Sequence, residues 1–319
     1  MRLKLVRDVT SIDFFSRAKL WLGLSGFLVV LAFASFMLQG LNYGIDFSAG
    51  TILRTKTTEN ISISDYRQAL GELDIGDFSI TDVYDPTFED NEFVRMVRFQ
   101  GKDDEEVASV ETMNSVESAL RAVDPNISFT AGGSVGPKVS QELIQSAVIA
   151  VILAIVVVLI YIWIRFEWQF ALGAVLALVH DVILTIGIFS EFQIKFDLAI
   201  IAALLTIVGY SLNDSVVVFD RVRENLRKYK SQPLREVLNR SINETLSRTL
   251  MTSATTLIAL LTLLVLGGDV IRGFVFAMTW GVIVGTYSSV FVASAVIYVL
   301  GVKRDWSKTP DQPNAGTQF

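Results

Sequence analysis

An aspartate stands inside a stretch of sequence that otherwise suits the interior of a lipid bilayer. The apolar run at residues 198–219 is long enough to cross a membrane, and it contains Asp214. Ser211 and Asn213 lie close to it in the sequence. An ionisable side chain at the middle of a spanning helix costs about 2.5–3.5 kcal/mol on insertion scales, so such residues usually have a function. We therefore expect Asp214 to couple the protein to protons or to another cation.

A second charge, Arg248, lies near the start of the next apolar run. At the rise of an α-helix, Asp214 is roughly 9 Å and Arg248 roughly 6 Å from the same end of their spans. We expect these antiparallel neighbours to pair, because each charge offsets the insertion cost of the other. Arginine keeps its proton whereas aspartate titrates, so protonation or cation binding at Asp214 would release Arg248. A static pair that only fixes helix packing is the alternative.

Asp181 and its neighbour His180 lie in another apolar run. Neighbours in sequence point to different faces of a helix, so the step indicates either hydrogen bonding within the bundle or a second relay group. The sequence contains no phosphate-binding loop, zinc motif or dinucleotide fingerprint. We therefore expect no enzyme activity and no cofactor, with H⁺ or Na⁺ as the coupling ion.

Two further features would help helices to pack around these groups. Gly281 and Gly285 form a GxxxG step in the last apolar run, which permits close packing within the chain or with a partner. Hydroxyl residues crowd the start of the fifth run, where they can bond across helices or line a wet path. They are Thr245, Ser247, Thr249, Thr252, Ser253, Thr255 and Thr256.

The composition predicts a polytopic α-helical membrane protein. Apolar residues make up 51% of the 319, and there is no cysteine and one histidine, which excludes disulfides and multi-histidine metal sites. Six apolar runs reach the roughly 17–25 residues that a spanning helix needs. The first is too long for a usual signal-peptide core, so we expect an uncleaved anchor. The runs cover residues 20–38, 144–164, 170–189, 198–219, 249–266 and 274–300.

Lysine and arginine predict the orientation. They gather in the N-terminal segment, at Arg165, in residues 221–240 and in the C-terminal tail. All four segments fall on one side of a six-span topology, which the positive-inside rule makes cytoplasmic. We expect residues 221–245 to form two amphipathic pieces, broken at Pro233, along the inner membrane surface. Their basic charge is better explained as a signal that keeps this segment on the cytoplasmic side than as a nucleic-acid-binding surface.

Residues 40–138 form a polar insert on the opposite side, with 18 acidic and 8 basic side chains. The period of the apolar positions alternates between that of a strand and that of a helix. The resulting βαββαβ order is ferredoxin-like, and without a chemical motif we interpret the domain as a binding or lever module. The expected strands are 51–57, 78–84, 92–99 and 126–131, and the expected helices are 64–73, capped by Ser64, and 103–123.

Glycine-bearing segments flank this domain. Gly44, Asp46 and Gly50 follow the first span, and Gly136 and Pro137 precede the second. Because glycine permits tight turns and proline fixes a stiff exit, these positions are candidate hinges; ordinary linker turns are the alternative. The chain then divides into residues 1–39, 40–138, 139–301 and a tail, 302–319, that we expect to be disordered.

The chain resembles the SecF family of the bacterial Sec protein-export machinery. The resemblance covers nearly the whole chain, and the segment around Asp214 is its most specific part. Ala49 departs from the family, which usually has a second glycine before Gly50, and this would reduce the freedom of that hinge. The matching segments are Gly44-Ile45-Asp46-Phe47, Gly50-Thr51, Val135-Gly136-Pro137, Arg165-Phe166-Glu167-Trp168, Arg248-Thr249 and residues 177–181, 209–215 and 220–225.

The resemblance implies half of an RND-type transporter in the bacterial inner membrane, with cytoplasmic termini and a periplasmic domain. It implies that the chain works with SecD and uses the proton- or sodium-motive force to promote the late translocation and release of unfolded polypeptide. Asp214 and Arg248 would carry the intramembrane role. The SecYEG channel and SecA would be wider partners, with YajC, YidC and membrane lipids as further candidates. An RND-type small-molecule efflux component and a scaffold that transports nothing stay open as alternatives.

Overall fold

The computed structural model describes residues 10–47, 50–73, 75–83, 93–100, 108–135 and 137–302. They form two compact units, a helical bundle and a smaller unit made of residues 42–150 with residues 195–198. Gly136, residues 103–107 and the tail beyond residue 302 lie outside the described residues, so the expectations placed on them stay predictions.

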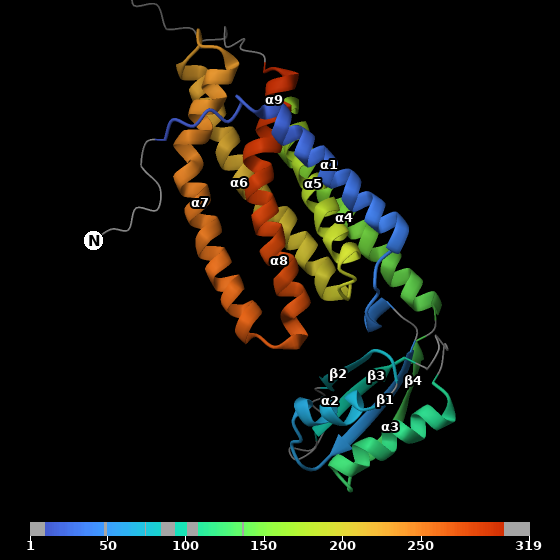
Figure 1. The fold of residues 1–319 in the computed structure, drawn as a ribbon. Coiled ribbons are helices and arrows are strands. Elements are labelled where there is room, and N and C mark those ends of the chain that lie inside the picture. The colour runs from blue at the N-terminus through green and yellow to red at the C-terminus, as the bar shows by residue number, and fades with distance from the viewer. Residues whose placement is uncertain are drawn as a thin grey trace, which may run out of the picture. The chain divides into compact units, whose positions relative to one another are not determined.

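Six helical segments of the described chain are long and apolar enough to cross a membrane, as expected (Figure 1). The last of them is one continuous span that consists of two α-helices, α8 and α9, joined by a short π-helical segment, η3. The segments are α1 (Ala18–Gln39), α4 (Pro137–Arg165), α5 (Trp168–Glu191), α6 (Leu198–Lys228), α7 (Leu234–Leu266), and the run of α8 (Asp269–Ser288), η3 (Ser289–Ala293) and α9 (Ser294–Leu300).

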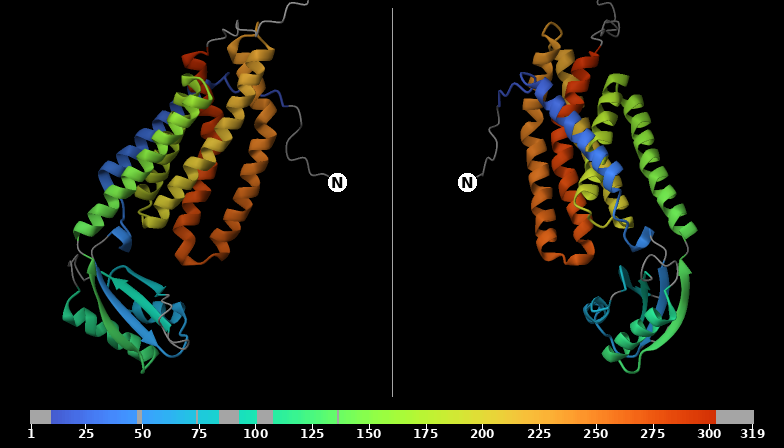
Figure 2. Two further views of the ribbon diagram at one scale, coloured as in Figure 1. Left: turned by 180° about the vertical axis from the view of Figure 1, so that it is seen from behind. Right: turned by 45° about the vertical axis from the view of Figure 1, so that its right-hand side comes forward.

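Most of α5 is buried, as is most of the run of α8, η3 and α9, whereas the apolar side chains of α4 and α7 are mostly exposed or only partly buried. Helix α1 packs along α5, at a place where a side chain on Gly187 would collide with Ala32. Helices α7 and α8 form an antiparallel pair (Figures 1 and 2). The exposed faces of α4 and α7 are therefore left for lipid or for another protein.

Residues 221–245 are not the separate surface element that we expected. Helix α6 continues to Lys228 and α7 begins at Leu234, directly after Pro233, so both pieces are continuous with spanning helices. The apolar face of each piece packs into the bundle core, where Val222 and Ile242 are fully buried. A proline suits this position because the first turn of a helix needs no amide donor there.

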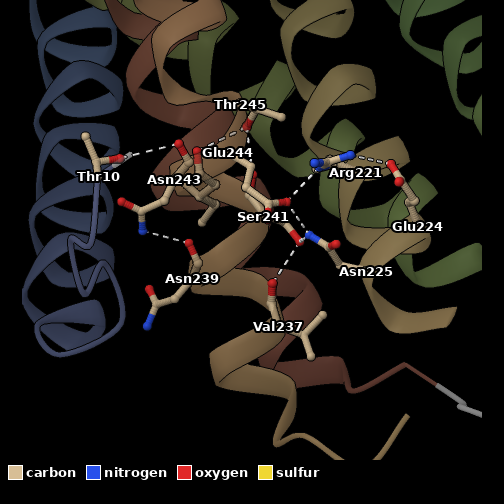
Figure 3. Close-up of polar contacts among 11 residues, drawn as sticks. Thr10, Arg221, Glu224, Asn225, Val237, Asn239, Ser241, Asn243, Glu244 and Thr245 are labelled. Atoms are coloured by element: carbon tan, nitrogen blue, oxygen red, sulfur yellow. Dashed lines mark hydrogen bonds and ion pairs between the residues drawn. The ribbon is translucent and has the colours of Figure 1, made fainter. Parts of the chain in front are cut away.

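The segment before α1 is attached to α7. The Asn239 side chain accepts a hydrogen bond from the amide of Phe14, and Asn243 bonds both backbone groups of Ile12; Figure 3 shows both asparagines beside Thr10. The Asn239 amide and the Arg235 guanidinium hold the pKa of Asp13 below its ordinary value. This contact is therefore complete at neutral pH and weakens only as the pH falls through the lowered pKa.

The smaller unit is ferredoxin-like, as expected. Its antiparallel sheet has the order β2-β3-β1-β4, and α2 and α3 pack together over a core that includes Leu53, Tyr66 and Val116. Residues 42–44 and 195–198 join it through a short parallel bridge. The elements are η1 (Ile45–Phe47), β1 (Gly50–Thr57), α2 (Ile63–Gly71), β2 (Phe78–Val83), β3 (Phe93–Phe99), α3 (Val110–Val123) and β4 (Ser128–Val135).

Several boundaries differ from the expected ones. Helix α2 is capped by Ser62 and not by Ser64, because Ser62 and Asp65 form a reciprocal capping box. Among the described residues α3 begins only at Val110, after the cap Ser109. Strand β4 continues to Val135, so residues 133–135 pair with β1 and are not a linker.

The candidate hinge residues after α1 are held in place. The amide of Gly44 donates to the carbonyl of Phe196 at 2.8 Å, and the carboxylate of Asp46 accepts from the amide of Leu198 at 3.2 Å. Gly50 lies in β1, where a Cβ would come within 2.8 Å of the carbonyl oxygen of Phe99. Pro137 is the first residue of α4, a position that suits proline.

A candidate ion-coupling site in the helical bundle

Helix α6 places Ser211 and Asp214 one turn apart on its buried face. These residues are 1% and 7% exposed, and Asp181, on α5, is 0% exposed. Side chains three residues apart on a helix share a face, which is why the spacing of the polar residues in α6 brings this pair together. Asn213 is exposed and lies on another face of α6.

The carboxylate of Asp181 is hydrogen-bonded at both oxygens. Its Oδ2 accepts from the hydroxyl of Ser211 at 2.7 Å and from that of Ser288 at 2.8 Å. Its Oδ1 lies 3.0 Å from Nδ1 of His180. A buried carboxylate without such donors would be costly. Asp181 therefore joins α5, α6 and the end of α8 through polar contacts.

The carboxylate of Asp214 is held in the same way. Its Oδ1 accepts from the hydroxyl of Thr249, on α7, at 2.7 Å. Its Oδ2 accepts from the hydroxyl of Ser289 at 2.5 Å. Hydrogen bonds from a hydroxyl to a charged oxygen are short and about twice as strong as neutral ones.

Adjacent serines connect the two carboxylates. Ser288 bonds Asp181 and Ser289 bonds Asp214, while Ser211 bonds Asp181 from the same face of α6 that carries Asp214. Ser289 begins the π-helical segment η3, and such segments often occur at functional sites. The two carboxylates thus belong to one buried polar network. Sequence reasoning missed both serines.

Ser288 and Ser289 form what we call the serine bridge between the two carboxylates. Each of these serines also lies near a second hydrogen-bond acceptor in its own helix. The Ser288 hydroxyl is 3.2 Å from the carbonyl of Gly285, and the Ser289 hydroxyl is 3.1 Å from that of Thr286. A hydroxyl has a single proton to donate. Either serine can therefore turn its proton away from the carboxylate while keeping a hydrogen bond.

The GxxxG step of α8 packs within the chain. A side chain on Gly281 would collide with Ile207 of α6. A Cβ on Gly285 would lie 3.1 Å from Cβ of Ser211 and 3.6 Å from Oδ2 of Asp181. The two glycines therefore let α8 approach α6 closely enough for the serine bridge to form.

We predict that Gly285→Leu destabilises the protein by about 1–3 kcal/mol, since overpacking a tight interface forces neighbours apart. Gly209→Ala on α6 is the control. Nothing lies within 4 Å of a Cβ there, so this change should add about 0.5–1 kcal/mol of helix propensity. Denaturation of the purified protein in detergent measures both. Unfolding of Gly285→Leu at the wild-type midpoint would contradict the proposed packing.

The expected ion pair between Asp214 and Arg248 does not form. Both residues are described, yet Asp214 is bonded by Thr249 and Ser289, and the Arg248 side chain is exposed. The next residue, Thr249, faces Asp214 because one step along a helix turns a side chain by about 100°. An ion-coupling role for Arg248 or Asn213 stays a prediction.

The groups of this site are chemically able to exchange a proton or to bind a cation. Within the described residues no group of three or more His, Asp or Glu side chains could hold a metal ion. Hydroxyls donate and accept, so the serines between the carboxylates can pass a proton, and the same oxygens suit a hard cation such as Na⁺.

A bundle of six candidate spans that buries two linked carboxylates, together with an inserted ferredoxin-like unit, is the architecture of an RND-type membrane transporter. Comparisons with known proteins show which family of such transporters the chain belongs to. The family described as "Protein export membrane protein SecD/SecF, C-terminal" matches residues 115–303, and the SecD/SecF GG motif matches residues 34–60. The chain belongs to the SecF family of protein translocase subunits, which act in protein export and are transporters rather than catalytic enzymes.

The similar proteins cover nearly the whole chain. The SecF subunit of Cereibacter sphaeroides is 56% identical over 100% of this chain and 98% of its own length, and that of Rhodobacter capsulatus is 53% identical over 96% and 94%. A crystal structure of SecDF in a super-membrane-facing form is 38% identical, with a TM-score of 0.75, over 93% of this chain and 39% of that longer chain. SecDF of Brucella abortus is likewise matched over 39% of its length. In such relatives the SecD and SecF parts form one polypeptide.

Proposed function

We propose that this chain, together with SecD, uses the proton- or sodium-motive force to promote the late translocation and release of exported polypeptides. The observation that carries the proposal is the buried network in which Ser288 and Ser289 link Asp181 to Asp214. Buried ionisable groups are costly and usually mark ion pathways in membrane proteins. The chain would lie in the bacterial inner membrane, with cytoplasmic termini and a periplasmic domain, beside the SecYEG channel and SecA.

The proposed step is a change in the bonds of Asp214. When Oδ2 of Asp214 takes a proton, its O–H donates to the oxygen of Ser289 and the serine proton turns to the carbonyl of Thr286, 3.1 Å away. Bound Na⁺ would turn the serine proton away similarly. Protonation weakens the attachment of α6 to η3, because a charge-assisted hydrogen bond is replaced by a neutral one; Na⁺ would instead replace that hydrogen bond by coordination to the carboxylate.

The energy of one ion is sufficient for such a switch. A charge that crosses 100 mV releases about 2.3 kcal/mol, which biases a two-state equilibrium by about 50-fold. Helix α6 begins at Leu198, whose amide is bonded to Asp46 next to the ferredoxin-like domain. Movement of α6 would therefore be transmitted to the candidate hinge around Gly44 and Asp46.

The test uses vesicles that contain this chain, SecD, the channel and its ATPase. A pH gradient, a sodium gradient or a membrane potential is imposed separately, and the release of a translocated polypeptide is timed. We expect one cation gradient to speed release severalfold, and the effective gradient identifies the ion. Release that is the same in all gradients would overturn ion coupling and favour a scaffold.

A further inference from the structure

A cationic cavity lies at the end of the bundle where α4 stops. It has a volume of about 720 Å³ and is lined by Arg165, Asp220, Arg223, Glu224, Arg227 and Lys228. Cavities of about 300–1,000 Å³ are typical of sites for small ligands. None of these residues belongs to the buried carboxylate network.

The charge of the cavity favours an anion. Four of its six lining side chains are cationic and two are carboxylates. One of these carboxylates, Glu224, is bonded at 2.5 Å to Arg221, which does not line the cavity (Figure 3). The carboxylates therefore offset the four cations only in part.

Two of the arginines contact the same aromatic ring. The guanidinium carbons of Arg165 and Arg223 lie 5.3 and 5.8 Å from the ring centre of Phe166. Nη1 of Arg223 also donates to the carbonyl of Arg165 at 3.3 Å. Two like charges that contact the same ring repel each other, and an anion bound near both of them would offset that repulsion.

The side chain of Arg223 also carries a hydrogen-bond donor that lacks an acceptor. Its Nε is buried and has no acceptor in the described part of the chain. A buried donor without an acceptor costs about 1–3 kcal/mol. A phosphate supplies several acceptor oxygens, and the arginine fork matches their geometry.

The surroundings indicate a lipid rather than a soluble anion. Trp163, Ile164 and Trp168 lie beside Arg165 in sequence and are 63%, 83% and 52% exposed. Exposed tryptophan at the end of a span is typical of the membrane interface. Helix α4 also exposes many apolar side chains, among them Val157 and Ile160, so acyl chains can lie along it while a headgroup enters the cavity.

We propose that this cavity binds the phosphate group of an anionic phospholipid, with Arg165 and Arg223 as the principal contacts. Basic pockets between the ends of spanning helices are typical sites for anionic headgroups. The lipid would fix the junction of α4 and α5 against α6, the helix that carries Asp214. Its acyl chains would cover the adjacent face of α4.

The test measures lipid retention. The full-length protein is placed in nanodiscs of phosphatidylcholine with a minor fraction of phosphatidylglycerol, and the lipids that remain bound after mild detergent extraction are counted by native mass spectrometry. We expect the wild type to retain phosphatidylglycerol selectively. The double variant Arg165→Gln/Arg223→Gln should reduce that selectivity about tenfold, because each cation near an anionic surface contributes to binding.

The control is Arg235→Gln/Arg240→Gln, which removes the same charge from α7 and leaves the cavity unchanged. It should keep wild-type selectivity. Arg165→Lys/Arg223→Lys retains the charge and should keep part of the binding, and circular dichroism checks that each variant folds. Equal selectivity in the wild type and the Gln variant, or equal loss in the control, would overturn the proposal. Displacement of the lipid by inorganic phosphate at millimolar concentration would also overturn it, since a soluble anion would then be the ligand.

Discussion

Asp214→Asn is expected to abolish the stimulation of export by an ion gradient while the chain stays folded and bound to SecD. Asparagine has nearly the size of aspartate and can still accept a hydrogen bond from Thr249 or Ser289. It cannot take up a proton or carry a charge at neutral pH. The packing is therefore kept and the ion exchange is lost. We expect the gradient-dependent part of the rate to fall at least about tenfold, the fold-change that corresponds to 1.4 kcal/mol.

The measurement is the release of a translocated polypeptide from vesicles, with and without the gradient, together with co-purification of SecD. Asp214→Glu keeps the carboxylate but lengthens the side chain, so it should retain part of the response. Glu191→Gln, an exposed carboxylate at the end of α5, is the control and should respond like the wild type. A normal gradient response of Asp214→Asn would contradict a coupling role for this aspartate.

Much of the fold follows from patterns that a single sequence displays. Apolar runs of sufficient length predicted all six spans of the described chain, because a bilayer requires long uncharged helices. The change of apolar period predicted the ferredoxin-like order. The cap of α2 was open to the same reasoning, since Ser62 and Asp65 have the spacing of a capping box. Ser64 lacks such a partner.

The candidate site was only half predictable. Asp181, Asp214 and Ser211 were expected because charged and polar residues are conspicuous in apolar runs. Ser288 and Ser289 were not, since a hydroxyl in a spanning helix commonly bonds its own backbone. Their role depends on how α8 is positioned against α6, which Gly281 and Gly285 determine through close contact, and on the π-helical turn that begins at Ser289.

The expected Asp214–Arg248 ion pair, which does not form, shows what an estimate of depth in the membrane cannot predict. Counting residues placed Asp214 level with the start of the fifth apolar run, and Thr249, the first residue of that run in α7, does bond it. Depth does not say which way a side chain faces, and one residue of error turns a helix position by about 100°. The hydroxyl therefore occupies the place that we expected for the guanidinium.

The second large effect on gradient-driven export is expected from substitutions in the serine bridge, Ser288 and Ser289. Ser289→Ala removes the 2.5 Å hydrogen bond to Asp214, and Ser288→Ala removes one of the two hydroxyl donors to Oδ2 of Asp181. A hydrogen bond to a charged group contributes about 1.5–3 kcal/mol, so Ser289→Ala should slow gradient-driven export by about tenfold or more. Ser288→Ala should have a smaller effect, because Ser211 still donates to the same oxygen. Thr279→Val is the control, as the hydroxyl of Thr279 bonds the backbone of its own helix.

The double variant Ser288→Ala/Ser289→Ala separates two accounts of this bridge. If the serines connect Asp181 and Asp214 as one path, either single change interrupts it, and the double change should add little to the slower single one. If each serine only supports its own carboxylate, the losses should multiply. Export rates of the wild type, both single variants and the double variant form the required cycle. Multiplying losses would restrict ion exchange to Asp214 alone, whereas coupled losses would make both carboxylates members of one relay.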